Sequence, residues 1–354
     1  MKWADKLNLG RIRGRLPKAR TAAASVAAGV VLAGCNPVYL VTGEVLKAYS
    51  TAHVIPYTLE GSDLDMSCAM SEALTPLLMS FGRVTWDPNQ IAVVVYQASG
   101  GCAESRAVEY ELESMAALRS MDGPGSQDAT IRQKRMLAVA AARYYESWTR
   151  FNYYYGEPVE GECPSLGGEQ DQFIYMIGLL AGLQALNAEV QSTTNLGVPK
   201  NLGSIVGSAV KCLDNEDWWG APNALEATIW AMLPGATPDN EDPFERLAES
   251  VEMGDEAGVR IARVFQIIAA TNRGDEELVR QAIREHAESL RETPSDEEWM
   301  LVDTIATEMV LSYSDRLWME NTGHRTPNGQ LGQFWDDQED DPLEDMDIDL
   351  DNLL

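Results

Sequence analysis

Histidine is scarce in this 354-residue chain, and the short motifs that mark common enzyme classes are missing. The three histidines are His53, His286 and His324, and no two of them stand at the spacing of a metal-binding helix. The sequence has no HExxH, GxSxG or GxxxxGK[ST] motif. A metal centre or catalytic triad would have to be assembled from distant residues. We therefore expect a non-catalytic protein without a metal or a cofactor.

Basic residues are also few, and they are concentrated at the start of the chain. Lys and Arg number 27 against 55 Asp and Glu, which gives a formal net charge of −28. Seven of the bases fall within the first twenty residues. Proteins that bind nucleic acid need basic patches because phosphate backbones are negative, and no such patch follows residue 35. The composition argues against a nucleic-acid partner.

The apolar run near the N-terminus is too short to span a membrane, because it covers only residues 21–32 and a spanning helix needs ~20 residues. It follows the basic segment and leads into residues typical of a lipobox: Leu32, Ala33, Gly34 and Cys35. This pattern resembles a bacterial lipoprotein signal, cut before Cys35 and lipidated on that thiol. Asn36 follows instead of aspartate, so we expect the periplasmic face of the outer membrane. The alternative is an ordinary signal peptide with a chance cysteine.

Four further cysteines form an even set, which suits disulfides in an oxidising compartment. Cys68 stands 14 residues before the glycine that ends one predicted helix, and Cys102 stands 14 residues after the proline that opens the next. In an antiparallel helix pair, both would lie ~21 Å from the turn. We therefore pair Cys68 with Cys102, which leaves Cys163 with Cys212. A metal site is the alternative, although the spacing is wide for one.

Strand-like alternation of apolar and polar residues is absent from the sequence, whereas helical spacing recurs along it. The expected helices cover residues 38–54, 63–81, 89–119, 128–154, 172–190, 202–213, 221–233, 243–253, 256–272, 275–291 and 295–313. Residues 121–125 should form a loop. The run 173–183 is apolar on all sides and should be a buried central helix. We predict an all-α fold, a bundle or solenoid of helix hairpins similar to tetratricopeptide repeats, although no strict 34-residue period fits.

The predicted layout has four parts. A lipoprotein signal peptide covers residues 1–34, the anchor and leading helix cover 35–62, the all-helical domain covers 63–335, and an acidic tail covers 336–354. Ten of the sixteen residues from 336 to 351 are acids, so we expect the tail to be disordered. The alternative is a docking peptide that uses its few apolar side chains: Met346, Ile348, Leu350, Leu353 and Leu354.

Aromatic residues gather in two places and are candidates for a ligand pocket. They are Tyr144, Tyr145, Trp148, Trp218, Trp219 and Trp230. Large aromatic side chains line apolar sites but also dominate cores. Composition does not separate these cases, and we favour the core.

A polar cluster near the end of the helical region offers a second candidate site. It contains Asp315, Arg316, Trp318, His324 and Arg325. Either arginine could clamp a ligand carboxylate in a bidentate manner. We favour the alternative that Asp315 and Arg325 tie a C-terminal strap to the bundle, because buried Arg and Asp are usually paired for structural reasons.

Three stretches of the sequence resemble the TatT-like family, the T-component lipoproteins associated with TRAP transporters. They are residues 74–78 with the helix after 88, residues 218–227 with 233–235, and residues 254–270 running on to 314–318 and 323–327. The resemblance implies a non-catalytic periplasmic helper that is built from tetratricopeptide-like helix pairs. A homotrimer is the assembly that the resemblance suggests. It also implies contact with a periplasmic substrate-binding protein and transfer of small hydrophobic or organic-acid ligands. The acidic tail and the four later cysteines depart from that pattern.

Two non-catalytic functions follow from the sequence, and the third hypothesis is a hydrolase or other enzyme that uses His324. The first is a lipid-anchored binding and scaffold protein that docks a substrate-binding protein or a small hydrophobic ligand. The second is a purely structural envelope scaffold with no small ligand. An aromatic pocket would favour the first function, and a filled core would favour the second.

Overall fold

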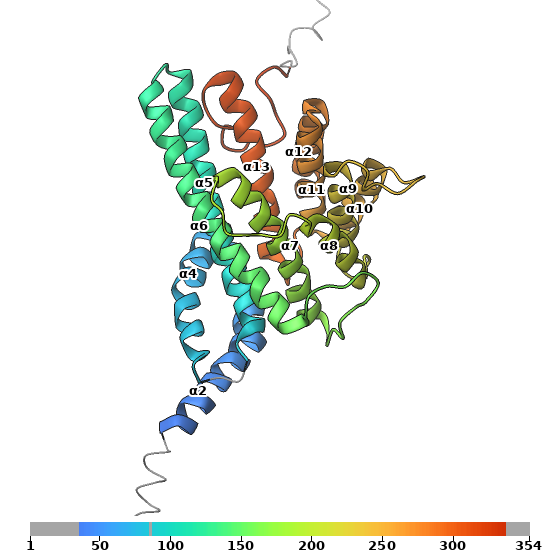
Figure 1. The fold of residues 1–354 in the computed structure, drawn as a ribbon. Helices are drawn as coiled ribbons and strands as arrows, with labels where there is room; N and C mark the ends of the chain where they lie inside the picture. The colour runs from blue at the N-terminus through green and yellow to red at the C-terminus, as the bar shows by residue number, and fades with distance from the viewer. Residues whose placement is uncertain (1–34, 85–86, 338–354) are drawn as a thin grey trace, which may run out of the picture.

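The computed structural model describes residues 35–84 and 87–337 (Figure 1). Every regular element in these two ranges is helical, and no β-strand occurs in them. The predicted all-α fold is confirmed. The predicted signal peptide, residues 1–34, and residues 338–354 of the predicted tail lie outside the described residues.

The N-terminal helical arm projects beyond the rest of the molecule, at the bottom of Figure 1. It consists of α2 (Cys35–Tyr49), a π-helical turn (Ser50–Val54) and α3 (Ile55–Leu59). The prediction that this helix ends at residue 54 was wrong. Pro56 lies in the first turn of α3, where a missing N–H and a fixed φ are tolerated, so the proline does not break the arm.

Two long antiparallel helices, α5 (Asn89–Arg119) and α6 (Gly123–Tyr155), form the spine of the fold, and α4 (Leu64–Phe81) packs beside α5 (Figure 1). Helix α6 begins five residues earlier than predicted, so most of the predicted loop 121–125 is helical. Asp122 caps it by accepting from the Gly125 backbone N–H at 3.0 Å, and a proline occupies the first turn.

Helix α7 (Glu169–Ser192) packs against both α5 and α6 and is the third helix of the spine. It is the one described helix that is long and apolar enough to cross a membrane, but it lies in the core, as predicted for a central helix. It is followed by α8 (Leu202–Ala209), a short 3₁₀ turn (Val210–Cys212) and α9 (Ala221–Met232).

The last four helices form short hairpins: α10 (Pro243–Ala257), α11 (Ile261–Arg273), α12 (Glu276–Glu292) and α13 (Met300–Thr322). Helix α13 contacts α5 on one side and α11 and α12 on the other, so it joins the hairpins to the spine.

Two predicted boundaries in this part were wrong. The break expected at residues 254–255 falls at Gly258, whose φ of +69° is readily reached by glycine. The last helix, expected at 295–313, runs instead from 300 to 322. Asp296 holds the preceding turn by accepting from the backbone N–H of Glu298 at 2.9 Å.

Both disulfides have the pairing expected from the spacing. Cys68 and Cys102 join α4 to α5 with a Cα–Cα distance of 5.6 Å. Cys163 and Cys212 join the loop before α7 to the turn after α8, at 5.5 Å. Both cross-links therefore lie in the part of the chain that precedes α9.

Candidate functional site

The six aromatic candidates belong to the core. Five of them are buried, and the most exposed of these, Trp230, shows 9% of its surface. Tyr145 is half-buried and packs against the same core. The interpretation as core residues, favoured from the sequence, agrees with these positions.

The aromatic residues of α6 pack tightly against glycines of α7. Phe151 stacks on Trp148 with 5.1 Å between ring centroids. A Cβ added at Gly178 would lie 2.3 Å from the Phe151 ring, and one at Gly182 would lie 2.9 Å from Trp148. These rings occupy the space that a side chain on α7 would fill, so they are packing residues and not walls of a pocket.

Trp218 and Trp219 form a separate aromatic group with a partner that the sequence did not single out. Trp299 lies 4.8 Å from Trp219 and 5.5 Å from Trp218, between ring centroids. The Trp218 indole Nε1–H donates to Gln172 Oε1 at 2.9 Å. A buried indole with its donor satisfied stabilises the junction of α7, α9 and α13.

The two arginines of the polar cluster are held by acids of α5. Arg316 donates from Nε and Nη2 to the two carboxylate oxygens of Glu111, at 3.0 and 3.1 Å. Arg325 donates in the same bidentate way to Glu109, at 2.9 and 2.7 Å. Both guanidinium forks are therefore directed at protein carboxylates, the geometry expected of structural ties.

The rest of the cluster fastens the segment after α13. Asp315 accepts from the Thr326 backbone N–H at 3.0 Å. The His324 ring lies 5.3 Å from Trp318, whose Nε1–H donates to the Gln333 carbonyl at 3.2 Å. These contacts match the strap that was favoured from the sequence.

A different feature, a groove over the C-terminal hairpins, is the best candidate site. It has a volume of about 680 Å³. Helices α10 and α12 form its walls and α11 forms its floor. The lining residues of this α10–α12 groove are Phe244, Ala248, Val251, Glu252, Asp255, Glu256, Arg263, Gln266, Leu278, Gln281, Glu285, Glu288, Ser289, Glu292 and Thr293.

The floor of the groove holds a buried arginine with incomplete hydrogen bonding. The Arg263 side chain is 4% exposed and ion-pairs with Glu285 and, at 2.6 Å, with Asp255. Arg263 Nε and Asp255 Oδ1 are both buried without a hydrogen-bond partner in the described part of the chain. Buried polar groups are rarely left unpaired, so the hydrogen bonding of this pair is incomplete within the described residues.

The walls of the groove are acidic. Six carboxylates line it against the single guanidinium of Arg263. Four of the acids, Glu252, Glu256, Glu288 and Glu292, are exposed, and none of them is in an ion pair with another described residue. The groove therefore presents a negative potential with apolar side chains at one end, namely Phe244, Ala248 and Leu278.

A buried ion pair supports the groove from below. Arg260 is fully buried, and its Nη1 donates to Asp303 Oδ2 at 2.7 Å. The Arg260 backbone N–H donates to the other carboxylate oxygen, Asp303 Oδ1, at 2.8 Å. Arg260 Nε donates to Ser289 Oγ at 2.7 Å. Since Ser289 also lines the groove, the pair fixes α12 against α11 and α13.

His286, on the inner side of α12, is neutral at physiological pH. Burial, with the positive charges of Arg263 and Arg260, lowers its pKa from 6.5 to about 3. Its Nε2 lies 3.1 Å from Thr307 Oγ1. The residue therefore belongs to the packing beneath the groove.

The groove was not predicted from the sequence. The available signal was the helical spacing of the lining residues, which places those of α12 on one helix face and those of α10 on another. They are residues 278, 281, 285, 288 and 292 of α12 and residues 244, 248, 252, 255 and 256 of α10. Acids on one face ordinarily indicate a solvated surface. Only the packing of three helices makes these two faces opposite walls.

The described residues contain no group of three or more His, Cys, Asp or Glu side chains placed to hold a metal ion. No family model, curated protein or solved structure matches the chain.

Proposed function

We propose that this protein is a lipid-anchored, non-catalytic docking protein of the bacterial envelope. In this proposal, the α10–α12 groove binds a positively charged segment of a second exported protein. The resemblance to the TatT-like lipoproteins makes a periplasmic substrate-binding protein the expected partner, and the outer membrane the expected location.

The observation that carries the proposal is the combination of shape and charge in the groove. A volume of about 680 Å³ exceeds what one side chain fills, and it suits a short peptide segment or an exposed helix turn. The four unpaired wall acids would attract lysine or arginine side chains.

The positions of the aromatic candidates favour a protein partner over a small apolar ligand. Tyr144, Trp148 and Trp218 are at most 4% exposed and pack in the core. A hydrophobic cargo would need those rings to line open space. The proposal therefore keeps the docking role and assigns no cargo pocket to this chain.

The docking site can be tested by site-specific cross-linking in cells of the source organism. A photo-reactive amino acid replaces Ala248, which is exposed and lines the groove. The same amino acid at Val190, on the surface of α7, serves as the control. We expect one discrete cross-linked protein from position 248 only. Equal cross-linking from both positions would contradict the proposal.

Charge reversal supplies the matched specificity test. Glu252→Lys with Glu288→Lys places a base on each wall, and we expect the position-248 cross-link to fall at least about tenfold because the partner is positive. Asp239→Lys with Glu241→Lys makes the same change of charge in the exposed loop before α10 and should leave the cross-link unchanged. A cross-link that survives wall reversal would rule out charge recognition in the groove.

The anchor is tested separately. Mass spectrometry of the N-terminal peptide from membranes should show cleavage before Cys35 and a diacylglycerol on it. Cys35→Ser should release the protein from the membrane fraction. An unmodified Cys35 in the wild-type chain would contradict the lipid anchor and leave the proposed docking in the groove unaffected.

A further inference from the structure

The N-terminal arm carries an exposed apolar face that no described part of the chain covers. Four of the five exposed large apolar side chains of α2 are Val38, Val41, Val45 and Tyr49, with 57–63% of each exposed. They are spaced by three or four residues, so they lie along one side of the helix. Thr42, Ala48 and Ala52 share this side and are also exposed. We call these seven residues the α2 stripe.

The α2 stripe contains no charged side chain. It has two polar side-chain groups, the hydroxyls of Thr42 and Tyr49. The Thr42 hydroxyl donates to the Val38 carbonyl of the same helix at 2.9 Å and so needs no acceptor from water. The stripe extends over residues 38–52, ~21 Å of helix. Uncharged faces of this length are unusual on a molecule with a net charge of −28 and mark a contact with an apolar environment.

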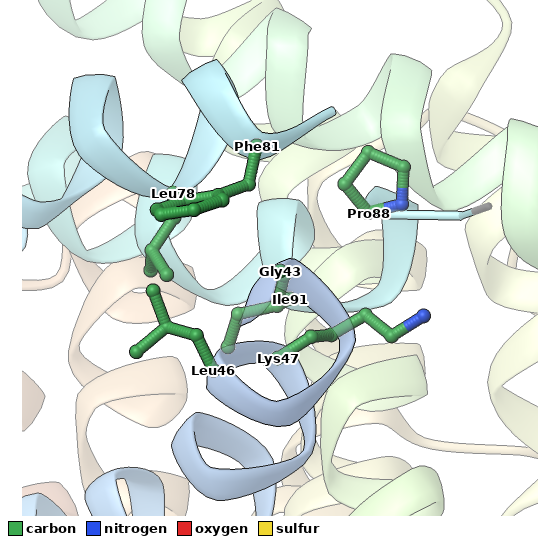
Figure 2. Close-up of a pocket in the computed structure, with 7 residues that line it drawn as sticks. All are labelled: Gly43, Leu46, Lys47, Leu78, Phe81, Pro88 and Ile91. Carbon is green, nitrogen blue, oxygen red and sulfur yellow. The ribbon is translucent and has the colours of Figure 1, made fainter. Parts of the chain in front are cut away.

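The opposite side of α2 is fixed against the body of the protein, as Figure 2 shows. Gly43, Leu46 and Lys47 lie there against Leu78, Phe81, Pro88 and Ile91 around a small crevice. Lys47 donates from Nζ to the Asp87 carbonyl at 3.1 Å and pairs with Glu44 at 2.7 Å. These contacts set the rotation of the helix, so the stripe points away from the body.

We infer that the α2 stripe lies in the interfacial region of a phospholipid bilayer, with its valine side chains in contact with acyl chains. The inference rests on the lipid anchor of the proposed function, because the stripe begins three residues after Cys35. A lipid on that residue holds α2 at the bilayer surface, where an uncharged valine face inserts and the charged body remains in water. Tyr39 and Tyr49, both exposed, have the ring and hydroxyl that favour this depth.

The inference can be tested without the lipid, so that the stripe alone is measured. The probe is a suspension of uncharged phosphatidylcholine and phosphatidylethanolamine vesicles, mixed with the chain from residue 35 that carries Cys35→Ser. We expect this protein to float with the vesicles. The double variant Val41→Asp, Val45→Asp should lower the bound fraction about tenfold or more, since two charges would enter the apolar region.

The matched control is Val190→Asp, because Val190 is 64% exposed against 63% for Val45 but lies on α7. It should not change flotation. A second measurement attaches an environment-sensitive fluorophore at Val45→Cys or at Val190→Cys. Vesicles should shift the emission to the blue only for the label at position 45, and this readout does not require the aspartate variants to fold.

Three results would overturn the inference: no flotation of the unlipidated chain, an equal loss with Val190→Asp, or no blue shift at position 45. A stripe that instead mediates self-association would show as a change in sedimentation mass on Val45→Asp without vesicles. Failure of lipidation at Cys35, read from the wild-type N-terminal peptide, would contradict the anchor while leaving vesicle binding by the stripe measurable on its own.

Discussion

The spine helices α5–α7 and the hairpin helices α10–α13 solve the same packing problem in different ways. In the spine, glycines such as Gly178 face aromatic rings such as Phe151, so the helices approach closely and the space between them is filled. In the hairpins, buried charges such as Arg260 and Asp303 sit between the helices, and a groove remains open beside them. The hairpin region therefore offers a charged groove for recognition.

The largest expected effect comes from breaking the buried pair of the hairpins. Asp303→Asn leaves the fully buried Arg260 without its counter-charge, and we expect the free energy of unfolding to fall by about 3–5 kcal/mol. Urea denaturation measures it. If the double variant Arg260→Met with Asp303→Leu is no more stable than Asp303→Asn, the loss is not due to an unpaired charge.

The comparable change in the spine is Gly178→Ala. The new methyl group would meet the Phe151 ring at 2.3 Å, and overpacking of this kind costs about 1–3 kcal/mol. Gly207→Ala is the control, because its nearest neighbour would be 3.7 Å away, and alanine should stabilise helix α8 by up to about 1 kcal/mol. Equal effects of the two alanines in thermal unfolding would contradict close packing of the spine.

Acidification should lower the free energy of unfolding through His286, which lies in the hairpin region. Its folded pKa of about 3 lies below the 6.5 of the unfolded chain, so the unfolded state takes up a proton first. Stability is full above pH 6.5 and falls as the pH decreases toward 3, by at most about 1.4 kcal/mol per pH unit. Glu72, whose pKa is lowered from 4.5 to about 2 by Arg106 and Arg143, adds a loss only below pH 4.5.

Burial raises the pKa of Glu104 and Glu308 above 4.5, so both also contribute to the pH dependence between pH 6.5 and 4.5, and a variant of His286 is needed to separate its contribution. His286→Gln should flatten the dependence of urea stability on pH there. An unchanged slope would show that His286 does not titrate there.

The smallest expected effect concerns the strap. Arg325 and Glu109 are 44% and 57% exposed, and exposed pairs contribute about 0–1 kcal/mol. Arg325→Ala should therefore change the free energy of unfolding by no more than about 1 kcal/mol. A larger loss in urea denaturation would show that the strap holds α13 against α5 more tightly than its exposure indicates.

The fold class and the disulfide pairing could be predicted because they depend on local signals: helical spacing, and cysteines at equal distances from a turn. The helix ends near Gly125 and Gly254 were predicted wrongly because local residues compete there. Asp122 caps a helix that begins within a stretch whose composition predicts a loop. Gly258, and not Gly254, adopts the left-handed conformation that ends α10. The groove could not be predicted, because its acids become walls only when α10 and α12 are brought together on α11.

The positions of the disulfides have a mechanical consequence. Cys68–Cys102 and Cys163–Cys212 cross-link the part of the molecule that precedes α9, whereas no disulfide holds α10–α13. If a partner in the groove is pulled while residue 35 is held at the membrane, the tension passes through both parts. In α10–α13 only packing and ion pairs such as Arg260–Asp303 resist this tension, whereas two covalent bonds resist it in the part that precedes α9.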